Sequence, residues 1–138
     1  RQDVIDLKPQ VVVILAGTND IAHNDYAMTP EQTFDNVVSM IQLAEANDIK
    51  VILCSTMPAS QFGWRPQLTP AEDIKALNAK FKAYADEHHI LYVDYHSAMQ
   101  DEAGGLPEKY SKDGVHPNLE GYKVMEKLVQ NALKKVIK

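Results

Sequence analysis

Val11-Val12-Val13-Ile14-Leu15-Ala16, followed directly by Gly17-Thr18-Asn19-Asp20, is the stretch that decides the fold. Its first six residues are all apolar and mostly β-branched, so the run is apolar on both faces. This pattern is typical of an inner strand of a parallel sheet that helices cover on both sides. Glycine, asparagine and aspartate then predict a turn. We therefore expect a strand over residues 11–16 that ends in a turn at its carboxyl end.

Two further apolar runs, residues 51–56 and 90–95, also predict strands. Helices are expected between and after them. Thr29-Pro30-Glu31-Gln32 is a helix start with a capping box, and a similar Thr-Pro start occurs at Thr69. The alternation of strand and helix predicts an α/β layered sheet with right-handed crossovers.

The last helix is expected to begin near Leu119. Its apolar residues recur at helical spacing and should face inward; they are Tyr122, Met125, Val129, Ala132 and Val136.

Composition limits the classes of protein to consider. The 138 residues are 45% hydrophobic and 24% charged, which favours a single globular domain over residues 1–138. A net charge of −5 without clustered lysine and arginine argues against a nucleic-acid partner. No apolar stretch is long enough for stable membrane insertion. The single cysteine, Cys54, rules out an internal disulfide, and because the sequence begins at Arg1 without methionine, the cellular compartment stays open.

A second informative stretch is Asp113-Gly114-Val115-His116-Pro117-Asn118. Glycine and proline predict a loop here, and Asn118 is a suitable cap for the following helix. An aspartate that orients a histidine general base fits this D-x-x-H spacing. The carboxyl ends of parallel strands share one edge of a sheet, so this loop, the turn at residues 17–20 and the loop over residues 57–68 should form one site.

The two motifs together resemble those of the SGNH (GDSL-type) hydrolases, which show a G-x-N-D turn after a central strand and a D-x-x-H loop before the last helix. The resemblance implies a three-layer αβα, flavodoxin-like parallel sheet and hydrolysis of carboxylic esters. It implies that His116 is the general base, that Asp113 orients it, and that Asn19 donates its side-chain amide to an oxyanion. No cofactor and no metal are expected.

The sequence departs from this family in one respect. The family's nucleophilic serine lies in a G-D-S motif well before the G-x-N-D strand, whereas none of the sixteen residues before Gly17 is serine. No other serine lies in a nucleophile-elbow context; they are Ser39, Ser55, Ser60, Ser97 and Ser111. We therefore expect that the nucleophile and the N-terminal strands lie outside this chain, and that the chain alone is inactive. An N-terminal segment or a second copy would be needed to cover the edge of the 11–16 strand.

The expected substrate is a small-molecule ester of short acyl length, on a sugar, a lipid or a small alcohol. Trp64 would stack on a sugar ring and Arg65 would meet an anionic group, unless their loop only folds over its own aromatic residues. Gly17, Met57 and Val115 are the other substrate-contact candidates.

Two other functions remain open. One is a non-catalytic, flavodoxin-like binding domain, which a G-D-S motif upstream of this chain would contradict. The other is a metal-dependent hydrolase that uses Asp113, His116 and either His96 or Asp94. No H-x-H or H-E-x-x-H spacing supports the metal site, and a metal analysis of purified protein would decide it.

Overall fold

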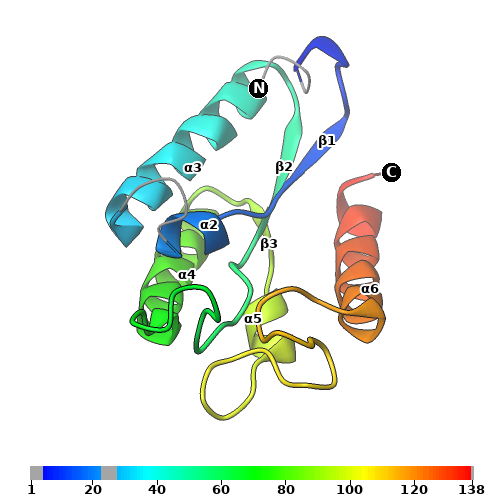
Figure 1. The fold of residues 1–138 in the computed structure, drawn as a ribbon. Helices are drawn as coiled ribbons and strands as arrows, with labels where there is room; N and C mark the ends of the chain where they lie inside the picture. The colour runs from blue at the N-terminus through cyan, green and yellow to red at the C-terminus, as the bar shows by residue number, and fades with distance from the viewer. Residues whose placement is uncertain (1–4, 23–27, 138) are drawn as a thin grey trace.

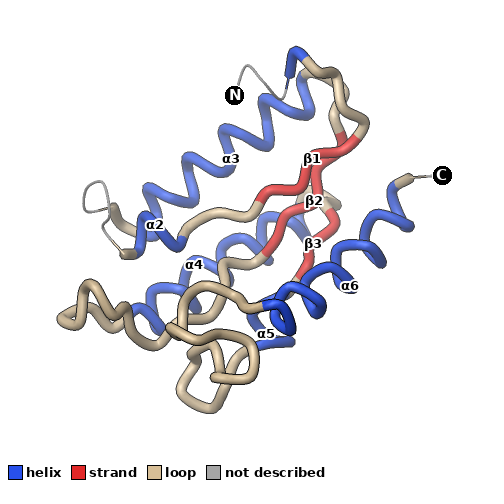
Figure 2. Tube along the Cα trace, turned by 45° about the vertical axis from the view of Figure 1, so that its right-hand side comes forward, coloured by secondary structure: helices blue, strands red, loops and turns tan. Residues whose placement is uncertain are grey.

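The computed structural model of the protein describes residues 5–22 and 28–137, and for Asn19 the backbone but not the side chain. Its centre is a sheet of three parallel strands in the order β1-β2-β3 (Figures 1 and 2). These are β1 (Val11–Ile14), β2 (Lys50–Cys54) and β3 (Leu91–Val93). Val12 lies opposite Val51, and Leu53 lies opposite Tyr92. The predicted α/β class with a parallel sheet is confirmed.

Helices form a layer on each side of the sheet. The long ones are α3 (Pro30–Ala46), α4 (Pro70–Glu87) and α6 (Leu119–Val136), and the short ones are α2 (Thr18–Ile21) and α5 (Tyr95–Met99). Figure 1 shows α3 and α4 on one side of the strands and α6 on the other. The order of strands and long helices is the predicted one.

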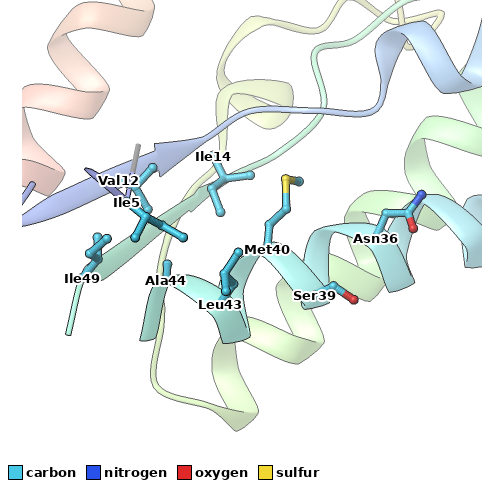
Figure 3. A pocket seen from close by; sticks show the side chains of 9 residues that line it. All are labelled: Ile5, Val12, Ile14, Asn36, Ser39, Met40, Leu43, Ala44 and Ile49. Atoms are coloured by element: carbon cyan, nitrogen blue, oxygen red, sulfur yellow. The ribbon is translucent and has the colours of Figure 1, made fainter. Parts of the chain in front are cut away.

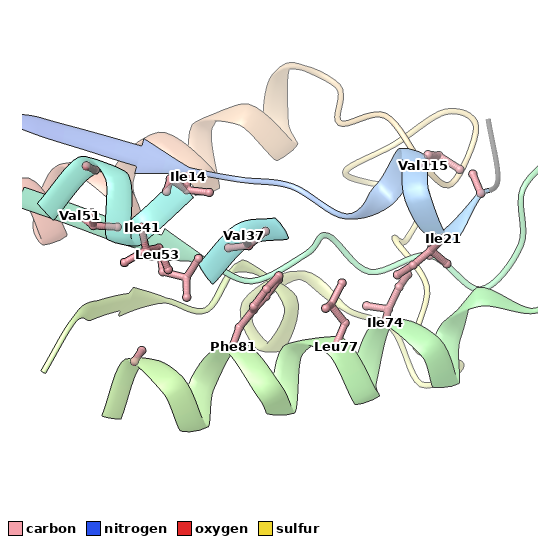
Figure 4. Close-up of a cluster of buried hydrophobic side chains, with 14 of the residues drawn as sticks. Ile14, Ile21, Val37, Ile41, Val51, Leu53, Ile74, Leu77, Phe81 and Val115 are labelled. Atoms are coloured by element: carbon pink, nitrogen blue, oxygen red, sulfur yellow. The ribbon is translucent and has the colours of Figure 1, made fainter. Parts of the chain in front are cut away.

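Two buried clusters explain why the strands are apolar on both faces. Side chains of Val12, Val51 and Leu53 pack on the α3–α4 side (Figure 4). Their strand neighbours Ile52 and Cys54 pack in the second cluster with residues of α5 and α6. Successive side chains of a strand point to opposite faces, so a strand covered on both sides has no polar positions.

Two of the predicted helix starts are confirmed in atomic detail. The hydroxyl oxygen of Thr29 accepts the backbone N–H of Gln32 at 3.1 Å, and Oε1 of Gln32 accepts the N–H of Thr29 at 2.9 Å, which completes the capping box. Oδ1 of Asn118 accepts the N–H of Gly121 at 2.9 Å. Thr69 precedes α4 as predicted but makes no side-chain capping bond.

Some boundaries differ from the prediction. The strand expected over residues 11–16 ends at Ile14, and the segment expected as a turn at Gly17–Asp20 forms the single helical turn α2. The short helix α5 was not predicted. Tyr122 does not face inward and is 55% exposed. Met125 and Ala132 are buried as predicted, but Gly121 takes the inward position in the first turn of α6, where it packs closely against the carbonyl oxygen of Tyr110.

The outer side of β1 is open among the described residues. Val13 is 40% exposed and Leu15 is 45% exposed. Beside this strand an apolar groove of about 370 Å³ runs between β1 and α3, with Val12, Met40 and Leu43 in its wall (Figure 3). In residues 5–22 and 28–137, no helix has both the length and the apolar character to cross a membrane.

Candidate active site

Asp113 and His116 are hydrogen-bonded to each other in the loop before α6. Nδ1 of His116 lies 2.6 Å from Oδ2 of Asp113. The other carboxylate oxygen, Oδ1, accepts the backbone N–H of Val115 at 2.9 Å and of His116 at 2.7 Å. Gly114 permits this tight turn because its φ is +80°, a conformation that favours glycine.

These hydrogen bonds define the electrostatics of the pair. The bond to the imidazole of His116, and after it the backbone N–H bonds, hold the pKa of Asp113 well below its ordinary value. The carboxylate is therefore ionised, and its bond to Nδ1 leaves Nε2 as the imidazole nitrogen that can exchange a proton. The side chain of His116 is 71% exposed and that of Asp113 is 50% exposed, so a reacting group can approach.

The loop is fixed where α6 begins. The N–H of Asn118 donates to the carbonyl oxygen of Tyr110 at 2.7 Å. A Cβ atom at Gly121 would lie 2.7 Å from that same oxygen, so glycine is needed for the helix to approach this closely. The first turn of α6 is thereby held against the loop that carries His116.

The turn after β1 is held by Thr56, which follows β2. The hydroxyl of Thr56 donates to the carbonyl oxygen of Ala16 at 2.8 Å. A Cβ atom at Gly17 would lie 2.6 Å from this hydroxyl oxygen, and the φ of Gly17 is +113°. Gly17 therefore allows α2 to begin directly beside the end of β2. The backbone of Asn19 lies in α2, and its side chain is outside what the structure describes.

Asn78 of α4 fixes Thr56 in turn. Its Oδ1 accepts the backbone N–H of Thr56 at 2.7 Å, and its Nδ2 donates to the carbonyl oxygen of Thr56 at 3.1 Å. The side-chain amide thus replaces a neighbouring strand at the end of β2. We call the group Asn78, Thr56 and Ala16 the strand-end clamp.

The two motifs meet at one end of the α3–α4 cluster. Ile21 of α2 and Val115, the neighbour of His116, both belong to this cluster together with Ile74 and Leu77 of α4. Figure 4 shows Ile21 and Val115 at the same end of it. The predicted convergence of the 17–20 and 113–116 stretches at one edge therefore agrees with the observed packing.

The loop over residues 57–68 brings an aromatic ring to the imidazole. The rings of Trp64 and His116 are stacked, with centroids 6.0 Å apart and an interplanar angle of 28°. Trp64 rests on the fully buried Phe62, with centroids 5.2 Å apart, and is 45% exposed. Of the other expected substrate contacts, Met57 is 6% exposed and packs in the cluster beside α5 and α6, and Val115 is 4% exposed and packs in the α3–α4 cluster, so both are core residues.

No serine in the described part of the chain is hydrogen-bonded to the imidazole of His116. Ser55 is fully buried, and its hydroxyl oxygen accepts the backbone N–H of His96 at 2.9 Å. Burial raises the pKa of the Cys54 thiol to about 11, which argues against a thiolate nucleophile. In the same residues no group of three or more histidine, cysteine, aspartate or glutamate side chains is placed to hold a metal ion.

Three residues with a structural part in this site were not singled out for it from the sequence: Thr56, Asn78 and Ser111. For Asn78 a signal exists, since it is a polar residue beside the inward positions Ile74, Leu77 and Phe81 of α4. For Ser111 the signal is a hydroxyl two residues before the aspartate of the motif, which suits a side-chain-to-backbone turn.

Residues 1–124 match the GDSL-like Lipase/Acylhydrolase family. A provisionally assigned acylhydrolase from Bacteroides fragilis is 51% identical with a TM-score of 0.97, over 100% of this chain and 67% of that one. A GDSL-like lipase from Bacteroides thetaiotaomicron is 47% identical with a TM-score of 0.96, over 99% of this chain and 68% of that one.

A curated relative is more distant. It is an acetylxylan esterase from Xylanibacter ruminicola, 25% identical in an alignment that covers 96% of this chain and 30% of the esterase. The chain therefore spans less than a third of the length of that relative.

Proposed function

Because this chain belongs to the GDSL-like lipase/acylhydrolase family, we propose that it is part of a serine esterase in which His116 is the general base and Asp113 orients it. The observation that carries the proposal is the 2.6 Å bond between Nδ1 of His116 and Oδ2 of Asp113. This bond selects the tautomer that leaves Nε2 as a proton acceptor, which a serine nucleophile needs.

In the proposed reaction, Nε2 of His116 takes the hydroxyl proton of the serine while the serine oxygen attacks the ester carbonyl carbon. The carbonyl π electrons move to oxygen and form a tetrahedral oxyanion. As this intermediate collapses, the bond to the alcohol oxygen breaks and His116 returns its proton to the departing alcohol. Water then attacks the acyl-serine in the same way and releases the carboxylic acid. Asp113 stabilises the imidazolium in both steps.

Asn19 is proposed as an oxyanion donor through its side-chain amide. A donor of this kind lowers the barrier by about 2.7–4 kcal/mol. Its backbone position in α2, beside the strand-end clamp, supports the proposal. The role of Gly17 is to let the backbone turn closely enough to bring α2 to this edge.

The proposed substrate is a short-acyl ester on a carbohydrate. Trp64 supports this, because a half-exposed indole beside the imidazole could stack on a sugar ring next to the scissile ester. The name of the acetylxylan esterase points to the same class. Arg65, next to Trp64, would contact an acidic group on the substrate; esters of lipids or small alcohols lack a sugar face for the indole.

The nucleophilic serine is proposed to come from a segment outside these residues that pairs with β1. Two features support a further strand and helix there: Val13 and Leu15 are exposed at the edge of β1, and an apolar groove lies between β1 and α3 on the side of Val12. A strand paired with β1 would end at the same edge as Asn19 and His116, where a serine can reach Nε2.

The test uses the complete protein and a short-chain aryl ester. We expect turnover that a serine-directed phosphonate abolishes, and a loss of several orders of magnitude in His116→Ala with the circular dichroism spectrum unchanged. His88→Ala, at the far end of α4 where the ring stacks on Tyr84, is the matched control and should keep wild-type turnover. Near-normal turnover in His116→Ala would remove His116 from the mechanism. Absence of turnover in the wild type on all esters would favour a binding domain.

A further inference from the structure

The hydroxyl of Ser111 lies at the centre of the loop that carries Asp113 and His116. The residue is 1% exposed. Its oxygen accepts the N–H of Gly114 at 2.9 Å, and it lies 2.7 Å from the carbonyl oxygen of His116 and 3.1 Å from Oδ1 of Asp113. One buried hydroxyl therefore contacts both ends of the loop.

A hydroxyl group has one proton, so Ser111 can make one full donation at a time. The shorter distance assigns that donation to the carbonyl oxygen of His116, and the longer one makes Oδ1 of Asp113 the secondary acceptor. The hydroxyl thus acts both as a hydrogen-bond acceptor and as a donor inside the loop. Loss of the hydroxyl would leave the N–H of Gly114 and the carbonyl of His116 without this partner.

The bonds of Asp113 alone do not fix the pair in space. They join the carboxylate to Val115 and His116, which lie in the same short segment and would move with it. Ser111 ties this segment to the preceding part of the loop: its own N–H donates to the carbonyl oxygen of Pro107, which follows the buried Leu106, at 3.0 Å, and its backbone forms a bridge with Pro117.

We propose that Ser111 is a positioning residue, which holds the Asp113–His116 pair at the place where His116 meets the nucleophile. This inference rests on the proposed function for its effect on turnover, but its effect on the pair does not depend on esterase activity. Ser111 acts through the backbone of His116 and the carboxylate of Asp113 and does not touch the reacting atoms.

The experiment compares Ser111→Ala, Ser111→Thr and Ser111→Cys in the complete protein, with Ser97→Ala, an exposed serine of α5, as the control. A misplacement of the base by about 1 Å can cost about a hundredfold in rate, so we expect kcat of Ser111→Ala to fall by about that factor with little change in KM. Ser111→Thr keeps the hydroxyl and should recover most of kcat. Ser111→Cys keeps the volume with a weaker hydrogen-bonding group and should resemble Ser111→Ala.

A second readout follows the pair itself. Proton NMR would follow the Nδ1–H proton of His116, which is bonded to Asp113. The exchange of this proton with water should be faster in Ser111→Ala than in the wild type or Ser111→Thr. Wild-type kcat with unchanged exchange in Ser111→Ala would overturn the inference. A lower melting temperature with unchanged exchange would reduce Ser111 to a stability role and also overturn it.

The two proposals fail separately. If His116→Ala stays active, the proposed function fails, and the exchange rate of the Nδ1–H proton still decides whether Ser111 positions the pair. If His116→Ala is inactive while Ser111→Ala is normal in both readouts, the proposed function stands and the inference about Ser111 falls.

Discussion

At the scale of single residues, the carboxylate of Asp113 uses its two oxygens for two tasks. Oδ2 is hydrogen-bonded to the imidazole. Oδ1 accepts hydrogen bonds from two backbone N–H groups and is the secondary acceptor for the hydroxyl of Ser111. Because charged acceptors make strong hydrogen bonds, this arrangement favours the ionised carboxylate and the folded loop together. Charge and loop conformation are therefore coupled at Asp113.

The first prediction concerns pH. The folded-state pKa of Asp113 lies below its ordinary value near 3.8, so the unfolded state binds the proton more readily. Its contribution to stability is then complete above about pH 4 and is lost as pH falls below that value. In urea titrations, the stability gap between wild type and Asp113→Asn should be largest at pH 5–7 and shrink towards pH 3. A gap independent of pH would contradict the coupling.

Asp113→Asn should also lower kcat by roughly 10⁴-fold, because the amide favours the wrong imidazole tautomer. Assays at a pH where both proteins are folded separate this loss from the loss of stability.

The second prediction concerns Asn19. Replacement by alanine should lower kcat about a hundredfold or more with little change in KM, since an oxyanion donor acts mainly on the transition state. Steady-state kinetics of the complete protein measure both constants. Asp20→Ala, the next residue of α2, is the control. An increase in KM alone would instead make Asn19 a residue that binds the ground state.

At the scale of elements, the strand-end clamp joins β1, β2 and α4 at the edge that carries the site. The side-chain amide of Asn78 pairs with both backbone groups of Thr56, and the hydroxyl of Thr56 pairs with Ala16. The position of α2 depends on this chain of bonds, because α2 follows Ala16 almost directly. A substitution in the clamp should therefore also shift the position of Asn19.

The third prediction tests this dependence. Thr56→Val keeps the shape but removes the hydroxyl, which should cost about 1–3 kcal/mol because the partly buried carbonyl of Ala16 loses its partner. Turnover should fall as well. Thr56→Ser keeps the hydroxyl and should be closer to wild type in both respects. Urea denaturation and kcat at one temperature measure the two effects; equal behaviour of the Val and Ser variants would show that the hydroxyl plays no part.

The positions of the strands and of the start of α3 were predictable from the sequence, whereas the strand ends were not. Apolar runs predict where the strands lie, since helices on both sides leave no polar positions, and the capping box predicts the start of α3 from residues three positions apart. Strand ends are set by backbone pairing across the sheet, which the run Val11–Ala16 does not reveal. The predicted inward orientation of Tyr122 was wrong because Gly121, which has no apolar side chain, takes the inward position.

The site follows the same rule. The Asp113–His116 bond was predictable because two side chains three positions apart in one loop can meet without any distant contact. The stacking of Trp64 on His116 and the clamp by Asn78 depend on tertiary packing between distant segments, which spacing does not encode.

At the scale of the whole molecule, the main feature is the open side of β1. Val13 and Leu15 at the edge of β1, and Met40 of α3, are each 40% exposed or more. An exposed apolar strand edge is a surface for pairing with another strand. Under the proposed function, this edge is where the segment that carries the serine would pair with β1.

The fourth prediction is that residues 1–138, made alone, have no esterase activity and are not a stable monomer. Under the proposed function the serine nucleophile lies outside these residues, and the edge of β1 favours association with a second chain. Sedimentation velocity and an ester assay on the same sample test both parts. A well-folded monomer would contradict the stability argument, and serine-type activity would mean that a serine of this chain is the nucleophile.

The short spacing between Asp113 and His116 has a consequence for folding. Bringing together two side chains three positions apart costs little loop-closure entropy, whereas Asn19 reaches the same edge only after β1, β2 and α4 have assembled. The Asp113–His116 contact thus has low sequence separation, whereas the position of Asn19 depends on contacts of high sequence separation. A variant with a weakened core would therefore lose the position of Asn19 first and keep the Asp113–His116 bond intact.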